Sequence, residues 1–206
     1  TTGEAAIWIN TPVALVAAGG TFAAGWLATK LYKKYPGAIA WVPAIGLALS
    51  VPFYLIAFTT ENLLYAGICL GIGGFAKYGY LAAQYTIGQG VVSMRVRATA
   101  PAVLLFVVTL IGYGLGPLFL GAISDIFFVN GIMEMGVGAE ELARSQCHPR
   151  VIGELSEPLQ NVCGSIYAGS LRSAMLITAS LYAACAVFFL LTWRRLDKDM
   201  IDRNPG

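Results

Sequence analysis

The segment between Arg97 and Asp125 constrains this chain most, because it contains no charged residue. As an α-helix rising about 1.5 Å per residue, a segment of this length can cross a hydrocarbon core of about 30 Å. Its glycines would weaken a helix in water, but in lipid the pair Gly112 and Gly116 lets a neighbouring helix approach closely. Pro117 lacks an amide donor and predicts a bend. We therefore expect a membrane-spanning helix that packs against other helices.

The composition extends this expectation to the whole chain. Hydrophobic residues make up 57% of the sequence and charged residues 12%, and the mean hydropathy is +0.70. A soluble domain of 206 residues could hardly cover its surface with so few polar groups. The basic residues flank apolar segments and do not alternate with aromatic residues on one surface, which argues against nucleic acid as a partner. The composition predicts an all-α, multi-pass membrane protein.

Five transmembrane helices are predicted, at about 11–29, 38–58, 62–92, 98–124 and 173–193. Residues 126–172 are predicted to form an outer loop and residues 194–206 a cytoplasmic tail. The positive-inside rule supports this arrangement, because most basic residues follow the first, third and fifth spans. They are Lys30, Lys33, Lys34, Arg95, Arg97, Arg194, Arg195, Lys198 and Arg203. Thr1 would then lie outside, so we expect a fragment that lacks an odd number of upstream spans.

The predicted outer loop holds two of the four cysteines, Cys147 and Cys163. Fifteen residues separate them, and a disulfide that closes such a loop contributes about 3 kcal/mol on the oxidising side of a membrane. The alternative is a pair of free thiols. We expect the disulfide.

Lys77 is the first candidate for a binding residue, because it lies near the middle of the third span. A lysine there costs about 2.5 to 3.5 kcal/mol and normally faces a protein interior or a water-filled cavity. Helical spacing places Tyr80 and Gln84 near the same stripe. Thr109 and Tyr113 of the fourth span share a face that could line the opposite wall, although ordinary packing also explains them. These five residues are the predicted substrate site; in the alternative, Lys77 snorkels or pairs with an acid elsewhere.

The spans contain no aspartate or glutamate. If protons drive transport, the titrating carboxylate lies upstream, unless Lys77 carries the proton. The chain also lacks the HExxH, GxSxG and phosphate-loop signatures. We expect no catalytic residue, metal or cofactor, and a membrane-embedded enzyme or a scaffold subunit is the alternative to a transporter.

Three segments resemble the carboxyl-terminal half of a major facilitator superfamily transporter, of the spinster-like branch. GGTFAAGWLATKLYKK is similar to the basic signature between two helices of each half. YGYLAAQYTIGQGVVSMRVRATA resembles the helix before the penultimate span, and GYGLGPLFLGAISD resembles the end of that span. The resemblance implies helices eight to twelve and an inner-gate motif at Gly25, Lys30, Lys33, Lys34, Arg95 and Arg97. Thr29 replaces the usual acid, which puts a charge relay at that gate in doubt.

The resemblance also implies a function. Members of this branch are secondary active transporters that work by alternating access, and their cargo includes lysolipids and sphingoid lipids. The expected partners are therefore a small-molecule substrate that is amphipathic or anionic, such as a lysolipid or an organic anion, together with membrane lipid and the missing amino-terminal half. Proton coupling is one alternative for the driving force. The expected location is the bacterial inner membrane.

Overall fold

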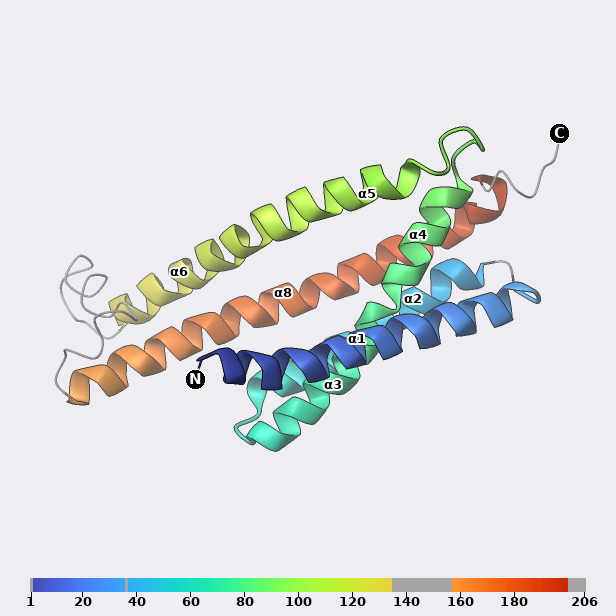
Figure 1. Ribbon diagram of the computed structural model, residues 1–206. Coiled ribbons are helices and arrows are strands. Elements are labelled where there is room, and N and C mark those ends of the chain that lie inside the picture. Colours follow the sequence, from blue (N-terminus) through green and yellow to red (C-terminus); the bar gives the residue numbers. More distant parts are fainter. Residues whose placement is uncertain (1, 36, 135–156, 200–206) are drawn as a thin grey trace. The chain divides into compact units, whose positions relative to one another are not determined.

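The computed structural model describes residues 2–35, 37–134 and 157–199, and every regular element among them is helical (Figure 1). These elements are α1 (Thr2–Tyr32), α2 (Ala38–Thr59), α3 (Leu63–Tyr78), α4 (Tyr80–Gly90), α5 (Ala100–Val108), the π-helix η1 (Thr109–Leu115), α6 (Gly116–Glu134) and α8 (Glu157–Asp199). Within the described residues, four segments are long and apolar enough to cross a membrane: Pro12–Tyr32, Ala38–Thr59, Ala100–Met133 and Gln160–Leu196. The predicted all-α membrane fold is confirmed.

The predicted third span, residues 62–92, is divided into α3 and α4 at Gly79. Asn62 caps α3, because its side-chain oxygen accepts hydrogen bonds from the amides of Leu64 and Tyr65 at 3.1 and 3.2 Å. A Cβ at Gly79 would lie 2.6 Å from the Cβ of Ala24 in α1. Close approach of α1 therefore coincides with the break, which hydropathy alone does not show.

The predicted fourth span continues as α5, η1 and α6 without a gap in its helical residues. Instead of a simple bend before Pro117, the chain forms seven residues of π-helix, Thr109–Leu115. Proline has no amide to donate to the carbonyl four residues earlier, and its ring collides with that carbonyl. The wider π-helical turns before Pro117 accommodate both effects.

The helices reach further into the predicted outer loop than the hydropathy indicated. α6 continues to Glu134 and α8 begins at Glu157, so both ends of the segment 126–172 are helical. Helices often continue beyond the hydrocarbon core when their polar residues favour helix, so the bounds of the outer loop stay a prediction.

The described chain separates into two compact units. The first comprises Thr1–Thr109 and Ala179–Gly206, and the second comprises Leu110–Thr178. Small residues permit the packing of the first unit. A Cβ at Gly46 of α2 would lie 2.5 Å from the carbonyl oxygen of Ala76 in α3, and one at Gly20 of α1 would overlap the carbonyl of Phe75.

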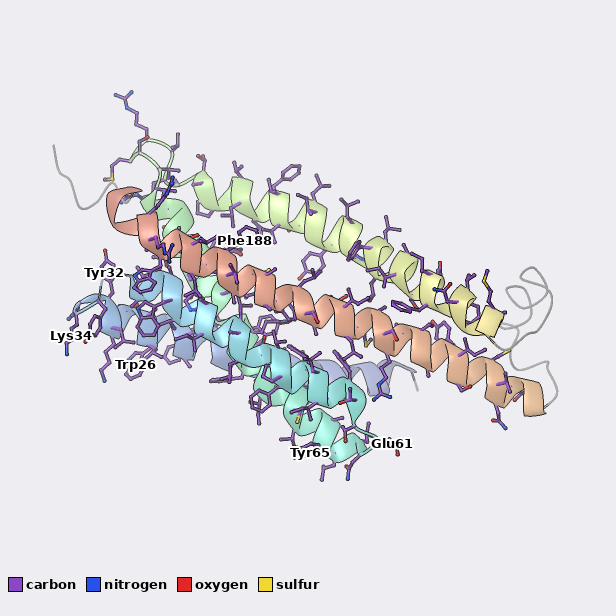
Figure 2. All side chains as sticks on the ribbon, turned by 180° about the vertical axis from the view of Figure 1, so that it is seen from behind. Trp26, Tyr32, Lys34, Glu61, Tyr65 and Phe188 are labelled. Carbon is purple, nitrogen blue, oxygen red and sulfur yellow. The ribbon has the colours of Figure 1, made fainter. Side chains whose placement is uncertain are left out.

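One end of the first unit gathers the basic residues. Figure 1 shows the α1–α2 turn, the α4–α5 connection and the last turns of α8 at this end. The core beneath it combines Ile39 and Ala40 of α2 with Ala83 of α4 and Leu196 of α8. Figure 2 shows Lys34 at this end and Glu61 at the other. The sequence places Arg194 and Arg195 near the same end, in agreement with the predicted charge asymmetry.

The second unit pairs α6 with the first part of α8. The buried hydroxyls of Ser124 and Ser170 lie 3.5 Å apart. Ser170 donates to the carbonyl of Tyr167 at 2.9 Å, which leaves Ser124 as the donor between the two serines. Phe128 and Tyr167 meet edge to face, with ring centroids 6.4 Å apart.

Candidate functional site

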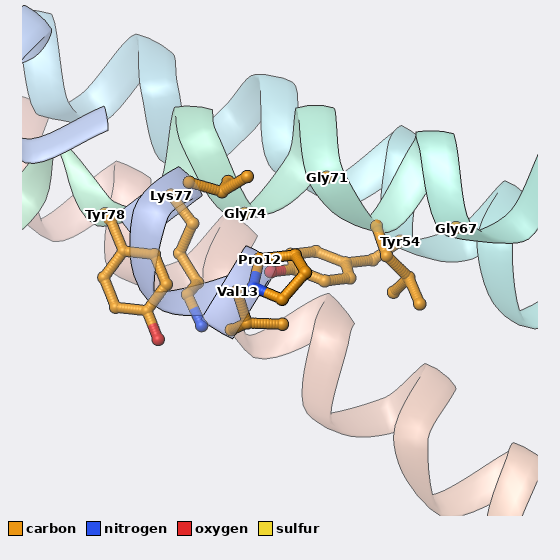
Figure 3. A pocket seen from close by; sticks show the side chains of 10 residues that line it. Pro12, Val13, Tyr54, Gly67, Gly71, Gly74, Lys77 and Tyr78 are labelled. Carbon is orange, nitrogen blue, oxygen red and sulfur yellow. The ribbon is translucent and has the colours of Figure 1, made fainter. Parts of the chain in front are cut away.

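A cavity of about 470 Å³ opens in the first unit between α1, α2 and α3 (Figure 3). Most of its wall is apolar, and its polar groups are the ammonium of Lys77 and the hydroxyls of two tyrosines. The lining residues are Pro12, Val13, Val16, Tyr54, Gly67, Leu70, Gly71, Gly74, Lys77 and Tyr78. A cavity of this size and character suits a small amphipathic molecule.

Glycines of α3 make room for this cavity. Gly67 and Gly71 have open space where a side chain would begin, since no atom lies within 4 Å of a Cβ built at either position. Gly74 is closer to its neighbours, with a Cβ position 3.6 Å from Val16 and 3.8 Å from the Tyr54 hydroxyl. Larger residues at these three positions would fill the space from the α3 side.

The Lys77 ammonium lies among three tyrosine rings from three helices. The nitrogen is 4.6 Å from the ring centroid of Tyr78 in α3, 5.3 Å from that of Tyr182 in α8 and 5.8 Å from that of Tyr54 in α2. It also donates to the Tyr182 hydroxyl at 3.4 Å. The rings of Tyr54 and Tyr182 lie next to each other, with centroids 5.7 Å apart. We call the three tyrosines that surround the Lys77 ammonium, Tyr54, Tyr78 and Tyr182, the tyrosine cage.

The cage stabilises the lysine without a carboxylate. The rings present their negative faces to the ammonium, and each such contact contributes about 0.5 to 2 kcal/mol, more where water is excluded. Among the described residues, Lys77 has no ion pair, and its ammonium contacts these three tyrosines. No carboxylate of the described residues therefore competes with an anionic group in the cavity for this ammonium.

The structure places the other four predicted substrate residues outside the cavity wall. Tyr80 and Gln84 belong to α4, beyond the break at Gly79. The side-chain nitrogen of Gln84 is buried and has no hydrogen-bond partner among the described atoms. Thr109 begins η1, and Tyr113 belongs to the second unit, where its side chain is 81% exposed. Of the predicted set, Lys77 alone lines this cavity, so roles for the others stay predictions.

The residues of the predicted inner-gate motif lie at the basic end of the first unit. A Cβ at Gly25 would contact Ala82 at 3.3 Å, so this glycine brings α1 close to α4. Lys30 lies over the Trp26 ring at 4.8 Å, and Lys34 over Tyr35 at 5.3 Å. The side chains of Lys33 and Arg95 are exposed and that of Arg97 is half-buried.

The predicted disulfide involves Cys147, which lies outside the described part of the chain. The neighbouring His148 lies outside it as well. Its predicted partner Cys163 is fully buried in the second unit. The pairing therefore stays a prediction. Cys69 and Cys185 are free thiols, and Cys69 packs as a buried apolar residue.

Sequence reasoning missed the tyrosines of the cage. Tyr54, Tyr78 and Tyr182 lie in three predicted spans that are far apart in the sequence. A tyrosine inside an apolar span is a weak signal for a binding site, since its ring packs readily in a helical bundle. Their convergence on Lys77 is visible only in three dimensions.

Two solved structures resemble the chain along its entire length. Both are of a bacterial homologue of the human lysosomal transporter Spinster, in inward-facing conformations. The unoccupied form has a TM-score of 0.82 and 38% sequence identity, and the chain covers 43% of its length. The occupied form has a TM-score of 0.81 and 37% identity, with 44% of its length covered. No protein-family model and no curated protein matches the chain.

Proposed function

The chain belongs to the spinster-like branch of the major facilitator superfamily, and we propose that it forms the carboxyl-terminal half of a secondary active transporter. The complete protein would move an amphipathic or anionic small molecule, a lysolipid or an organic anion, across the bacterial inner membrane. The observation that carries this proposal is the tyrosine cage at the wall of an apolar cavity.

The cavity suits a molecule with one acidic end and one apolar end. A phosphate or carboxylate group pairs with the Lys77 ammonium, which has no competing carboxylate among the described residues. An acyl chain lies against the apolar cavity residues Val13 and Val16 of α1 and Leu70 of α3. Burial of apolar surface and one charge-assisted contact then both contribute to binding.

Alternating access in this proposal uses the close contacts of α1 with α3 and α4. Small residues at Gly20, Gly25 and Gly79 leave smooth helix surfaces that slide past each other with little steric hindrance. The break at Gly79, directly after Lys77 and Tyr78, resembles the discontinuous helices that many transporters place at their binding sites. Movement at this break would couple cavity opening to the tyrosine cage.

Transport by the full-length protein in proteoliposomes tests the proposal. Lysolipids and small organic anions are offered one at a time, with and without an imposed pH gradient. We expect net movement of at least one of them. Faster movement in the presence of the pH gradient would indicate that transport is coupled to protons. If a folded protein moves none of these solutes, the transport proposal is wrong.

A further inference from the structure

The tyrosine cage has the form of a site for a quaternary ammonium group, but the protein's own lysine occupies it. Aromatic rings grouped around one position recognise methylated ammonium ions through their negative faces. Here the rings of Tyr54, Tyr78 and Tyr182 all lie within 5.8 Å of the Lys77 nitrogen. Tyr54 and Tyr78 also line the cavity, so the cage and the cavity share two walls.

We propose that Lys77 selects the head group of the cargo by occupying this cage. A head group with net negative charge finds a cation at the cavity wall. A trimethylammonium head group finds its aromatic site filled and meets a like charge instead. The site therefore accepts phosphate or carboxylate heads and rejects choline-like heads. This inference rests on the proposed function only in that the cavity holds cargo.

Three features of the cage carry this proposal. The cation is held by two kinds of contact, because the ammonium lies over three rings and also donates a hydrogen bond to the Tyr182 hydroxyl at 3.4 Å. Its rings come from α2, α3 and α8, so the cage keeps its walls when the lysine is replaced. No carboxylate of the described residues pairs with Lys77, so none of them neutralises the charge that repels a second cation.

The test is a comparison of two probes that share an alkyl chain, octyl phosphate and octyltrimethylammonium. Their binding to the full-length protein in detergent is measured by calorimetry, with a blank titration into micelles alone. We expect the unmodified protein to prefer octyl phosphate. In Lys77→Met the order should reverse, with binding of octyltrimethylammonium strengthened about tenfold, as expected for a cation over vacated rings.

Three further variants make the result specific. Lys77→Arg keeps the charge and should keep the preference for octyl phosphate. Adding Tyr78→Leu to Lys77→Met should remove the gained binding of octyltrimethylammonium, because one ring of the cage is lost. Adding Tyr65→Leu, at an exposed tyrosine elsewhere on α3, should leave that gain intact.

The inference is overturned if Lys77→Met loses octyl phosphate without gaining octyltrimethylammonium, or if Tyr65→Leu removes the gain as fully as Tyr78→Leu. A protein that shows the reversal in binding but transports nothing would support the cage and contradict the proposed function. A protein that transports anions but shows no reversal in binding would support the proposed function and contradict the inference about the cage.

Discussion

Two glycines of the first unit, Gly20 and Gly46, lie against backbone atoms of another helix, whereas Gly112 and Gly116 of the second unit face open space. Gly20 and Gly46 approach the carbonyls of Phe75 and Ala76 so closely that a Cβ would overlap them or nearly so. Within the second unit, no atom lies within 4 Å of a Cβ built at Gly112 or Gly116. The same residue type therefore permits close helix packing at Gly20 and Gly46 and has no such partner at Gly112 and Gly116.

The comparison shows that a pattern of small residues indicates an ability to pack, but not a partner. We expected the Gly112 and Gly116 pair to receive a neighbouring helix, and within the second unit it does not. The close approach occurs in the first unit, where α1 and α2 lie beside α3. The four predictions that follow test this difference, beginning with the largest effect.

Replacing Gly20 with valine should destabilise the protein most. The new side chain would collide with the backbone of Phe75, which cannot rotate away, so we expect a loss of about 3 kcal/mol or more. Thermal unfolding of the full-length protein in detergent measures this loss. Gly112→Val is the matched control and should change stability by less than about 1 kcal/mol. Equal losses would show that the Gly112 face is packed by a segment outside the second unit, which would break the comparison.

Reduction of the predicted disulfide should weaken the second unit specifically. Closure of the loop between Cys147 and Cys163 contributes about 3 kcal/mol, so a reducing agent or Cys163→Ala should lower the unfolding temperature. Mass spectrometry of peptides alkylated before and after reduction identifies the bond. A Cys185→Ala variant, which removes a free thiol, should respond to the reducing agent like the unmodified protein. Alkylation of both cysteines without reduction would contradict the pairing.

Lys77→Met should reduce transport of an anionic solute about tenfold or more, because a charge-assisted contact contributes about 1.5 to 3 kcal/mol. Initial rates in proteoliposomes, at matched amounts of folded protein, measure the change. Lys77→Arg should retain most of the rate. Unchanged transport by Lys77→Met would remove Lys77 from the substrate contacts and leave the cage a packing feature of the first unit.

The smallest effect is expected at the serine pair of the second unit. Ser124→Ala removes the hydrogen bond to Ser170, and interhelical hydrogen bonds in membranes contribute about 0.6 kcal/mol on average. Thermal unfolding of the single variants and of the double alanine variant measures the coupling between the two hydroxyls. A double variant that loses the full sum of the two single losses would show that the 3.5 Å contact contributes nothing.

Hydropathy predicted the membrane class and most helices, because a charge-free run has few other stable arrangements in lipid. It did not predict the division at Gly79, since the residues around Lys77 remain apolar on both sides. Nor did it predict that helix extends into both ends of the segment 126–172, because polarity marks the membrane boundary and not the end of a helix. Of the candidate site, the sequence identified Lys77 through the energetic cost of a charge in lipid.

By itself, the sequence determined that this chain is an all-α membrane protein with basic residues clustered beside alternate spans. These properties follow from local composition, because each helix satisfies its own backbone hydrogen bonds whatever its neighbours are. Only the tertiary structure decided which glycines form contacts and which aromatic residues surround Lys77. Those properties depend on residues as distant in sequence as Tyr54 and Tyr182, which no local pattern brings together.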